Sequence, residues 1–235
     1  MPALIFIHYS TKTIPTTGVV SMELYFSPLA CSLATRIALY EANAEARFIE
    51  VDTKSKQLRD GSNFYPINPL GQVPVLRTDE GWLLKENTAI LPYVADAFPA
   101  ARLAPAVGTA ERAKLQEWLG FISTELHKGV FVPLLDPHAS SDVRAYTQKK
   151  VALRLDLLEQ HLGEQEFLLD RFTVADAYLV TVLNWAQYGG VDLAKWPAVA
   201  AYYKRTTLRP LVARALTEEI ALFGEEQARR QASAS

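Results

Sequence analysis

A proline at the start of a short apolar run constrains the fold more than any other feature of this chain. The turn-forming residues 68–71 (Asn-Pro-Leu-Gly) lead into the apolar residues 73–76, which contain Pro74. Because proline lacks a backbone N–H, it cannot occupy a central strand but can open one after a bend. A cis Val73–Pro74 bond would make that bend and leave the Val73 N–H and C=O unpaired, facing an extended, peptide-like ligand. The alternative is a plain β-turn before an edge strand.

The residues around this bend predict a small sheet with helices on its faces. Strand and helix patterns follow in the order β-α-β-β-β-α, over residues 22–26, 30–42, 47–51, 73–76, 82–84 and 86–97. A crossover through a helix favours a parallel strand pair, and the Asp-Glu-Gly turn at 79–81 favours an antiparallel one. We therefore expect a mixed four-stranded sheet. Residues 52–67 are polar and irregular, with room for one short helix.

The second half of the chain is helical in pattern. Residues 98–108, rich in alanine and proline, are typical of a linker. We expect an α/β domain over residues 22–100 and an all-α domain over residues 109–226, whose apolar residues recur at helical spacing. The polar tail, residues 227–235, is expected to fray.

The first 21 residues differ in pattern from the rest of the chain. An apolar patch too short for a secretory signal precedes a loop-like stretch rich in threonine and proline. We expect residues 1–21 to be a poorly ordered extension and Met22 to be a natural start.

Composition excludes several classes of protein. The net charge of −2 provides no field for nucleic acid or an anionic membrane, and no apolar run approaches the roughly 18 residues that span a bilayer. The single cysteine excludes an internal disulfide and is compatible with a reducing compartment, so we expect a cytoplasmic protein. Phosphate-binding glycine loops are missing and the four histidines lack metal-ligand spacing, so we expect no nucleotide and no metal.

Cys31 is the first candidate for chemistry. It follows a strand at the start of a predicted helix, where partial positive charge and free N–H groups lower a thiol pKa. Ser32 is the next residue. The alternative is that Cys31 is a small buried hydrophobic residue.

His127 is the second candidate. Its predicted helix carries an apolar stripe on one face. Gly120, Ser123, Thr124 and His127 follow the i, i+3, i+4 and i+7 pattern and therefore share another, small and polar face. That face presents the imidazole to a ligand, or it is an ordinary solvated face.

Glu86 and Asn87 stand where the second helix begins. Backbone N–H groups there can receive a ligand carboxylate, and the helix dipole stabilises a side-chain carboxylate. Ordinary helix capping is the alternative. Lys54 and Lys56, in the irregular segment, could reach an anionic ligand, although loop lysines are usually only solvated.

Together these pieces resemble one family. Five motifs carry the resemblance: Tyr25-x-x-Pro28-x-Ala30-Cys31-Ser32-Leu33, Asn68-Pro69-x-Gly71-Gln72-Val73-Pro74, Glu86 before a helix, Thr124-Glu125-Leu126-His127-Lys128, and Phe172-Thr173-Val174-Ala175-Asp176-Ala177-Tyr178. In this order and spacing the chain resembles a bacterial beta-type glutathione S-transferase from about Met22 to Leu216. The resemblance implies a thioredoxin-like N-terminal domain, a helical C-terminal domain, and a homodimer with glutathione in the cleft between the domains.

The resemblance implies which residues surround the glutathione sulfur. Cys31 lies next to it and can form a mixed disulfide with it. His127 reaches it from the second domain, with Thr124 nearby. Ser32 and His127 donate hydrogen bonds that stabilise the thiolate.

It also implies which residues hold the rest of glutathione. Val73, before a cis Pro74, pairs with the backbone of its cysteinyl residue. Glu86 and Asn87 hold the γ-glutamyl end, and Lys56 approaches the glycine carboxylate.

Two positions depart from the family pattern. Beta-type enzymes often carry serine or glycine where Asn87 stands, and asparagine where Gly120 stands, so one polar contact near the sulfur is missing here. Thr173 and Asp176 match the family's capping box and are therefore structural.

The activity implied is conjugation of the glutathione thiolate to a small hydrophobic electrophile, as in detoxification, with glutathione as co-substrate. Two alternatives stay open. Cys31 itself could cycle through a glutathione mixed disulfide, giving thiol–disulfide exchange or peroxide reduction. The fold could also serve a non-enzymatic interaction protein.

Overall fold

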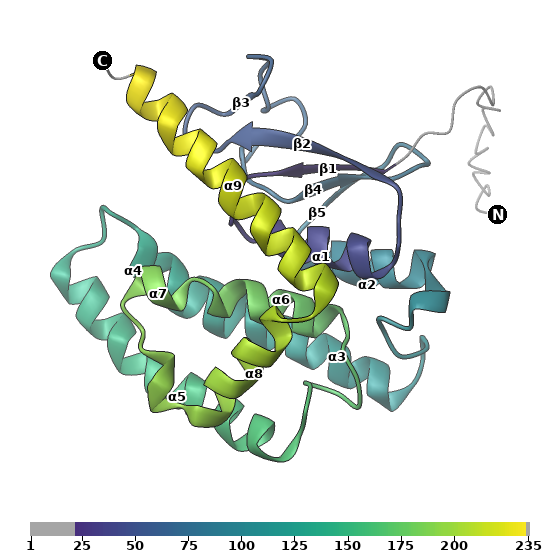
Figure 1. The fold of residues 1–235 in the computed structure, drawn as a ribbon, viewed down its shortest axis with the longest axis vertical. Coiled ribbons are helices and arrows are strands. Elements are labelled where there is room, and N and C mark those ends of the chain that lie inside the picture. The colour runs from purple at the N-terminus through teal and green to yellow at the C-terminus, as the bar shows by residue number, and fades with distance from the viewer. Residues whose placement is uncertain (1–21, 234–235) are drawn as a thin grey trace, which may run out of the picture.

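The structure is a computed structural model that describes residues 22–233. The expected extension over residues 1–21 lies outside the described residues. The chain forms a sheet layer and a larger helical layer, and the C-terminal helix runs diagonally across both (Figure 1).

The sheet has five strands, in the order β3-β2-β1-β4-β5. They are β1 (Met22–Phe26), β2 (Ala46–Asp52), β3 (Gln57–Leu58), β4 (Val75–Arg77) and β5 (Leu83–Lys85). β2 runs parallel to β1 and the other pairs are antiparallel, which confirms the mixed sheet. The expected number of four strands is wrong. In the polar segment where a short helix had room, residues 57–58 turn back and pair with residues 51–52 at the edge of β2.

Two helices belong to the sheet domain, α1 (Leu33–Glu41) and α2 (Asn87–Ala97). The predicted start of α1 at Ala30 is wrong by three residues. Leu29 has φ of 58° and belongs to a turn. The N–H groups of Ala30 and Leu33 close successive three-residue turns on Ser27 and Ala30, and four-residue helical bonding begins only with the Ser32 C=O. The loop between β1 and α1 is therefore a compact turn, which determines where Cys31 points.

The remaining helices build the second layer. They are α3 (Ala110–Phe121), the π-helix η2 (Ile122–Phe131), α4 (Val132–Leu135), α5 (Ser141–Glu164), α6 (Val174–Leu183), α7 (Ala186–Gly189), α8 (Pro197–Thr207) and α9 (Pro210–Ser233), with 3₁₀ turns η1 (Pro99–Ala101) and η3 (Leu193–Lys195). Every residue of α6 is buried, which makes it the centre of the core. α1 packs against both α6 and α9, and so joins the two layers. Among residues 22–233, no helix is both long enough and apolar enough to cross a membrane.

The predicted capping box at α6 is confirmed. Thr173 is the N-cap, and its N–H donates to Oδ2 of Asp176 at 2.9 Å. The other carboxylate oxygen of Asp176 accepts from the Leu168 N–H at 3.0 Å and the Tyr202 hydroxyl at 2.9 Å. One buried carboxylate therefore fixes the helix start and two distant segments.

The C-terminal tail does not fray where it is described. Residues 227–233 continue α9, which extends over the edge of the sheet. Arg229 pairs with Glu50, and Arg230 donates to Asp52 at 3.1 Å. A polar sequence at a chain end is typical of a frayed tail, but here its arginines form ion pairs with acidic residues of β2, which hold the helix in place.

Candidate active site

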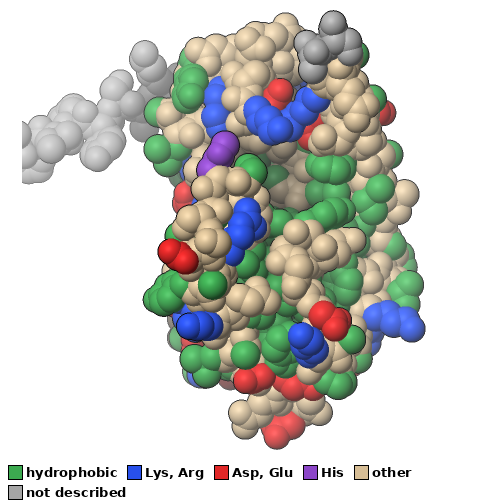
Figure 2. Space-filling view, turned by 90° about the vertical axis from the view of Figure 1, so that its left-hand side faces the viewer, with side chains coloured by type: hydrophobic (Ala, Val, Ile, Leu, Met, Phe, Trp, Pro, Cys, Tyr) green, Lys and Arg blue, Asp and Glu red, His purple; other side chains and the backbone are tan. Residues whose placement is uncertain are grey.

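A cleft of about 680 Å³ lies between the sheet domain and the helical layer. The sheet domain lines it with Cys31, Lys56 and Val73, and the helical layer with His127 and Trp185. Figure 2 shows the side of the molecule where α4, α7 and the end of α9 lie, and this face is hollowed with hydrophobic side chains inside. The fold therefore brings together residues that the sequence places up to 154 positions apart, from Cys31 to Trp185.

A narrow recess of about 20 Å³ adjoins the cleft. Cys31, Val73 and His127 line both spaces, and Glu86 and Tyr178 line only the recess. The thiol of Cys31 thus lies where an open apolar space meets a narrow polar one.

The Val73–Pro74 bond is cis, as predicted. The Val73 C=O is not left unpaired, which corrects the expectation, because the Cys31 thiol donates to it at 3.2 Å. The Val73 N–H has no hydrogen-bond partner within residues 22–233. The Val73 N–H is therefore available to a ligand in the recess, while the Val73 C=O is covered by the Cys31 thiol.

Cys31 does not behave as a lowered-pKa thiol in this structure. Burial raises its pKa to about 12, and the nearby Lys128 cation offsets only part of that rise. The predicted effect of a helix N-terminus is missing because α1 begins two residues later, at Leu33. At neutral pH Cys31 is a protonated hydrogen-bond donor.

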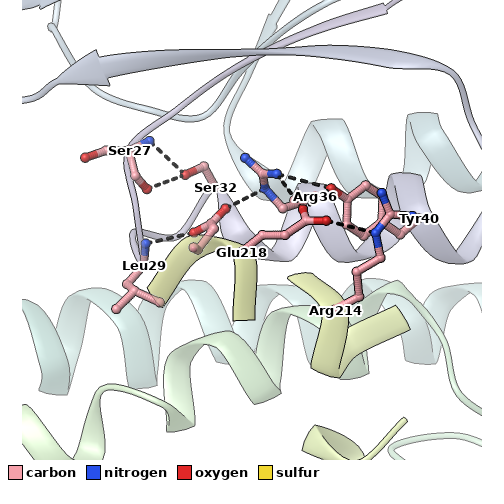
Figure 3. Close-up of polar contacts among 8 residues, drawn as sticks. Ser27, Leu29, Ser32, Arg36, Tyr40, Arg214 and Glu218 are labelled. Carbon is pink, nitrogen blue, oxygen red and sulfur yellow. Dashed lines mark hydrogen bonds and ion pairs between the residues drawn. The ribbon is translucent and has the colours of Figure 1, made fainter. Parts of the chain in front are cut away.

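Ser32 faces away from the cleft, which corrects its expected role near the sulfur. Its hydroxyl donates to the Ser27 C=O at 3.2 Å and accepts from the Ser27 N–H at 3.3 Å (Figure 3). The residue is completely buried. Ser32 therefore holds the loop between β1 and α1 in its turn.

The same loop is fixed from the helical layer at Leu29. The carboxylate of Glu219 on α9 accepts from the Leu29 N–H, and the indole N–H of Trp185 donates to the Leu29 C=O, each at 2.8 Å. Leu29 lies two residues before Cys31, so these two bonds position the thiol. The left-handed backbone of Leu29 is sustained by partners on both of its polar groups.

Glu219 also forms a buried ion pair with α1. It accepts from Nε of Arg36 at 2.8 Å, and Arg36 contacts Glu218 and Tyr40 in the network of Figure 3. Burial raises the pKa of Glu219 to about 7, although Arg36 opposes the rise. Sequence reasoning missed Glu219. The available signal was a carboxylate in register with the buried residues Val212, Ala215 and Leu216.

His127 is buried rather than displayed on a polar helix face. Its Nδ1 lies 2.7 Å from the Tyr178 hydroxyl, and its ring packs 4.9 Å from that of Trp185. Burial, reinforced by Lys128, lowers the pKa of His127 to about 4. The imidazole is therefore neutral at physiological pH.

Regular α-helical spacing would place Thr124 and His127 on one face, but in the structure they lie on different faces. Both lie in the π-helix, whose i→i+5 bonding changes the angle between them. The Thr124 hydroxyl is exposed, donates to the Gly120 C=O at 3.0 Å, and is not among the described residues that line the cleft or the recess. The π-turn depends on Gly129, where a Cβ would lie 2.8 Å from the Thr124 carbonyl oxygen.

Lys56 and Glu86 lie at the two ends of the site. The Lys56 ammonium donates to the Gly71 C=O at 3.0 Å and lines the open cleft. Glu86 is exposed at the start of α2, with φ of 68°, and lines the recess. Lys128 and Tyr178 also line the recess. Both belong to motifs that carry the family resemblance, but neither was predicted to be a site residue.

Asn87 is oriented differently from its expected role. Its amide donates to the Cys31 C=O at 2.8 Å and accepts from the Thr35 hydroxyl at 3.0 Å, so both ends of the side chain are engaged with the region of α1. Asn87 still lines the recess, but its side chain primarily holds the backbone of Cys31 and the start of α1. Within residues 22–233 no three metal-ligating side chains cluster, and the absence of a metal stays a prediction.

Comparisons with known proteins agree with this arrangement. Residues 21–96 match the family model described as the glutathione S-transferase N-terminal domain, and residues 148–205 match the one described as the C-terminal domain. Glutathione S-transferase GstA of Escherichia coli O157:H7 is 39% identical over 199 residues, covering 84% of this chain and 98% of the relative.

Solved structures extend the similarity to three dimensions. The ternary complex of BphK, a bacterial glutathione S-transferase, is 42% identical with a TM-score of 0.81. A sphingomonad glutathione S-transferase complexed with glutathione is 41% identical with a TM-score of 0.81, and the beta-class enzyme of Sphingomonas chungbukensis is 40% identical with a TM-score of 0.80. Each of the three covers 84% of this chain and 98% of its own. This chain belongs to the glutathione S-transferase family.

Proposed function

We propose that the chain conjugates the thiol of glutathione to small hydrophobic electrophiles. The observation that carries the proposal is the junction at Cys31 of a polar recess and an open, mostly apolar cleft. A tripeptide thiol that spans both spaces, with one end at Glu86 in the recess and the other at Lys56 in the cleft, would hold its sulfur beside Cys31 and the apolar side chains.

Glutathione is held at three points. The free Val73 N–H pairs with the backbone of its cysteinyl residue, and the ligand's own N–H replaces the Cys31 thiol at the Val73 C=O. The Glu86 carboxylate receives the γ-glutamyl ammonium, and Lys56 receives the glycine carboxylate. The proposal is supported by the relative whose structure is described as complexed with glutathione.

Conjugation requires the glutathione thiolate, which is stabilised by charge and donors near the sulfur. Lys128 supplies a cation at the junction of the two spaces, and the Cys31 thiol, once released from Val73, supplies a donor. The thiolate sulfur forms a bond to the electrophilic carbon. In an aryl chloride the carbon–chloride bond breaks, chloride leaves with the bonding electron pair, and the thiol proton passes to solvent.

Thiol–disulfide exchange through Cys31 is not favoured. Exchange needs the attacking thiol as thiolate, and burial raises the Cys31 pKa to about 12. A purely non-enzymatic role is not favoured either, because relatives 39% and 34% identical are named glutathione S-transferases.

The test combines binding with turnover. We expect glutathione to raise the melting temperature saturably, and the protein to conjugate it to 1-chloro-2,4-dinitrobenzene. Cys31→Ala should retain most of the glutathione-induced thermal shift and some conjugation while losing any disulfide exchange. A protein that neither shifts nor turns over would overturn the proposal.

We further infer a cytoplasmic homodimer acting in detoxification. Support for the dimer comes from a groove of about 490 Å³ beside Phe121, lined by Leu153 and Leu157, which are largely exposed on α5. A second copy covering this groove would remove those apolar side chains from water. Analytical ultracentrifugation tests this, and a monomer at micromolar concentration would contradict it.

A further inference from the structure

The cleft has a wall that comes from outside the region resembling the family. That resemblance ends near Leu216, yet α9 continues to Ser233. Phe223, Glu226 and Arg230 of this part of α9 line the same cleft as Cys31. The end of α9 therefore forms part of the wall of this cleft.

The helix geometry directs one row of side chains at the cleft. Glu219, Phe223, Glu226 and Arg230 are spaced by four, three and four residues, so they lie on one face of α9. In Figure 1 this helix passes alongside the strands of the sheet domain. The row therefore faces the sheet domain across the cleft.

Contacts on both sides of Phe223 fix this row. Toward the N-terminal end, Glu219 is completely buried and accepts from Leu29 at 2.8 Å. Toward the C-terminal end, Arg230 donates to Glu226 at 2.6 Å and to Asp52 at 3.1 Å. Because α9 is attached to the sheet domain at both points, Phe223 belongs to a fixed wall.

The lining of the cleft around this wall is largely hydrophobic. Most of the large hydrophobic side chains of its lining come from the loop before Cys31 and from the helical layer, among them Pro28, Leu29, Leu135, Trp185, Tyr188 and Phe223. The Phe223 ring is partly buried and packs against the core, so its orientation is restrained. A restrained ring favours a flat aromatic partner, because aromatic pairs gain energy beyond the area they bury.

We propose that Phe223 is a specificity-determining residue, which packs against the apolar body of the electrophile and selects aromatic over small aliphatic electrophiles. The inference rests on the proposed conjugation of glutathione. It names the electrophile class as aromatic, and it assigns the selection to a segment beyond the family resemblance.

The experiment compares two electrophiles on three proteins. Phe223→Ala should lower kcat/KM for 1-chloro-2,4-dinitrobenzene about tenfold relative to wild type. It should leave kcat/KM for iodomethane and KM for glutathione within about twofold, since neither ligand reaches the ring. The matched control is Ile220→Ala, on the same helix but 57% exposed, which should change neither electrophile's kinetics.

The outcomes separate this inference from the proposed function. A wild type that conjugates neither electrophile overturns both. A wild type that conjugates, with Phe223→Ala either unchanged or losing equally on both electrophiles, overturns only the role of Phe223. Phe223→Leu keeps an apolar side chain at the position should the alanine variant fold poorly, and an unchanged preference between the two electrophiles in that variant would also refute selection by the ring.

Discussion

Glu219 gives the sharpest prediction because it is a buried carboxylate that holds the loop before Cys31. The perturbation is Glu219→Gln, which removes the charge but keeps an oxygen for the Leu29 N–H. The amide NH2 of the variant cannot accept from Nε of Arg36, so the variant also loses that hydrogen bond. This loss does not depend on pH, so the pH dependence of the difference reports the ionisation of Glu219. Arg36 keeps its contacts with Glu218 and Tyr40 in both proteins.

The magnitude follows from the raised pKa. Burial raises the pKa of Glu219 from 4.5 to about 7, the direction expected when desolvation outweighs the attraction of Arg36. Below pH 4.5 the group is protonated in both folded and unfolded states, and its contribution to stability is fully present. As pH rises toward 7 the unfolded state loses its proton first, so the free energy of unfolding falls. At about 1.4 kcal/mol per pKa unit, the rise of about 2.5 units limits the loss to about 3.5 kcal/mol.

Urea denaturation of both proteins between pH 5 and pH 8, at one protein concentration, measures the effect. The quantity of interest is the difference in unfolding free energy between wild type and Glu219→Gln, because other titrating groups cancel in that difference. Wild type should lose stability relative to the variant as pH rises, and the difference should level off above pH 7. A difference that is flat, or that grows in favour of wild type, would show that the ion pair with Arg36 outweighs desolvation and would refute the reasoning.

Three further predictions concern stability and the state of the site. Burial lowers the pKa of His127 to about 4, so an NMR titration should show an imidazole that stays neutral above pH 5. Its contribution to stability is present above about pH 6.5 and is lost as pH falls toward 4. A titration midpoint near pH 6.5 would contradict its burial. Asp176→Ala should cost about 3 kcal/mol in urea denaturation, because four donors lose a buried acceptor; a loss below about 1 kcal/mol would show that water replaces it. Gly129→Ala should cost about 1–3 kcal/mol because its Cβ would meet the Thr124 carbonyl, whereas Gly163→Ala, with open space around it, should gain up to about 1 kcal/mol; equal thermal shifts for the two would argue against the π-turn.

Elements determined by local chemistry could be predicted from the sequence. The hairpin around residues 79–81 depends on residues adjacent in the chain, whereas the cis bond before Pro74 was implied by the resemblance to the family and is confirmed. The capping box of Thr173 and Asp176 is also local, because its two members stand three residues apart. Hydrophobic periodicity was sufficient for the division into a sheet domain and a helical layer.

The site residues that lie elsewhere than expected are polar groups engaged by other parts of the protein, whereas the number of strands and the start of α1 were misjudged from local patterns. Ser32 and Asn87 were expected at the ligand, but burial turned their side chains to the loop and to α1. Thr124 lost its register with His127 because the π-turn adds a residue to the helical repeat. The polar tail of α9 is helical because Arg229 meets Glu50, far away in sequence.

The sequence by itself determined the fold class, the bend at Pro74 and the family, since each is encoded in short patterns of spacing and backbone preference. Only the tertiary structure decided the protonation of Cys31 and His127, the role of Glu219 and the wall formed by Phe223. The physical reason is that pKa values and access to the cleft depend on what is packed around a group. The carboxylate that positions Leu29 lies 190 residues further along the chain, at a distance no local pattern can encode.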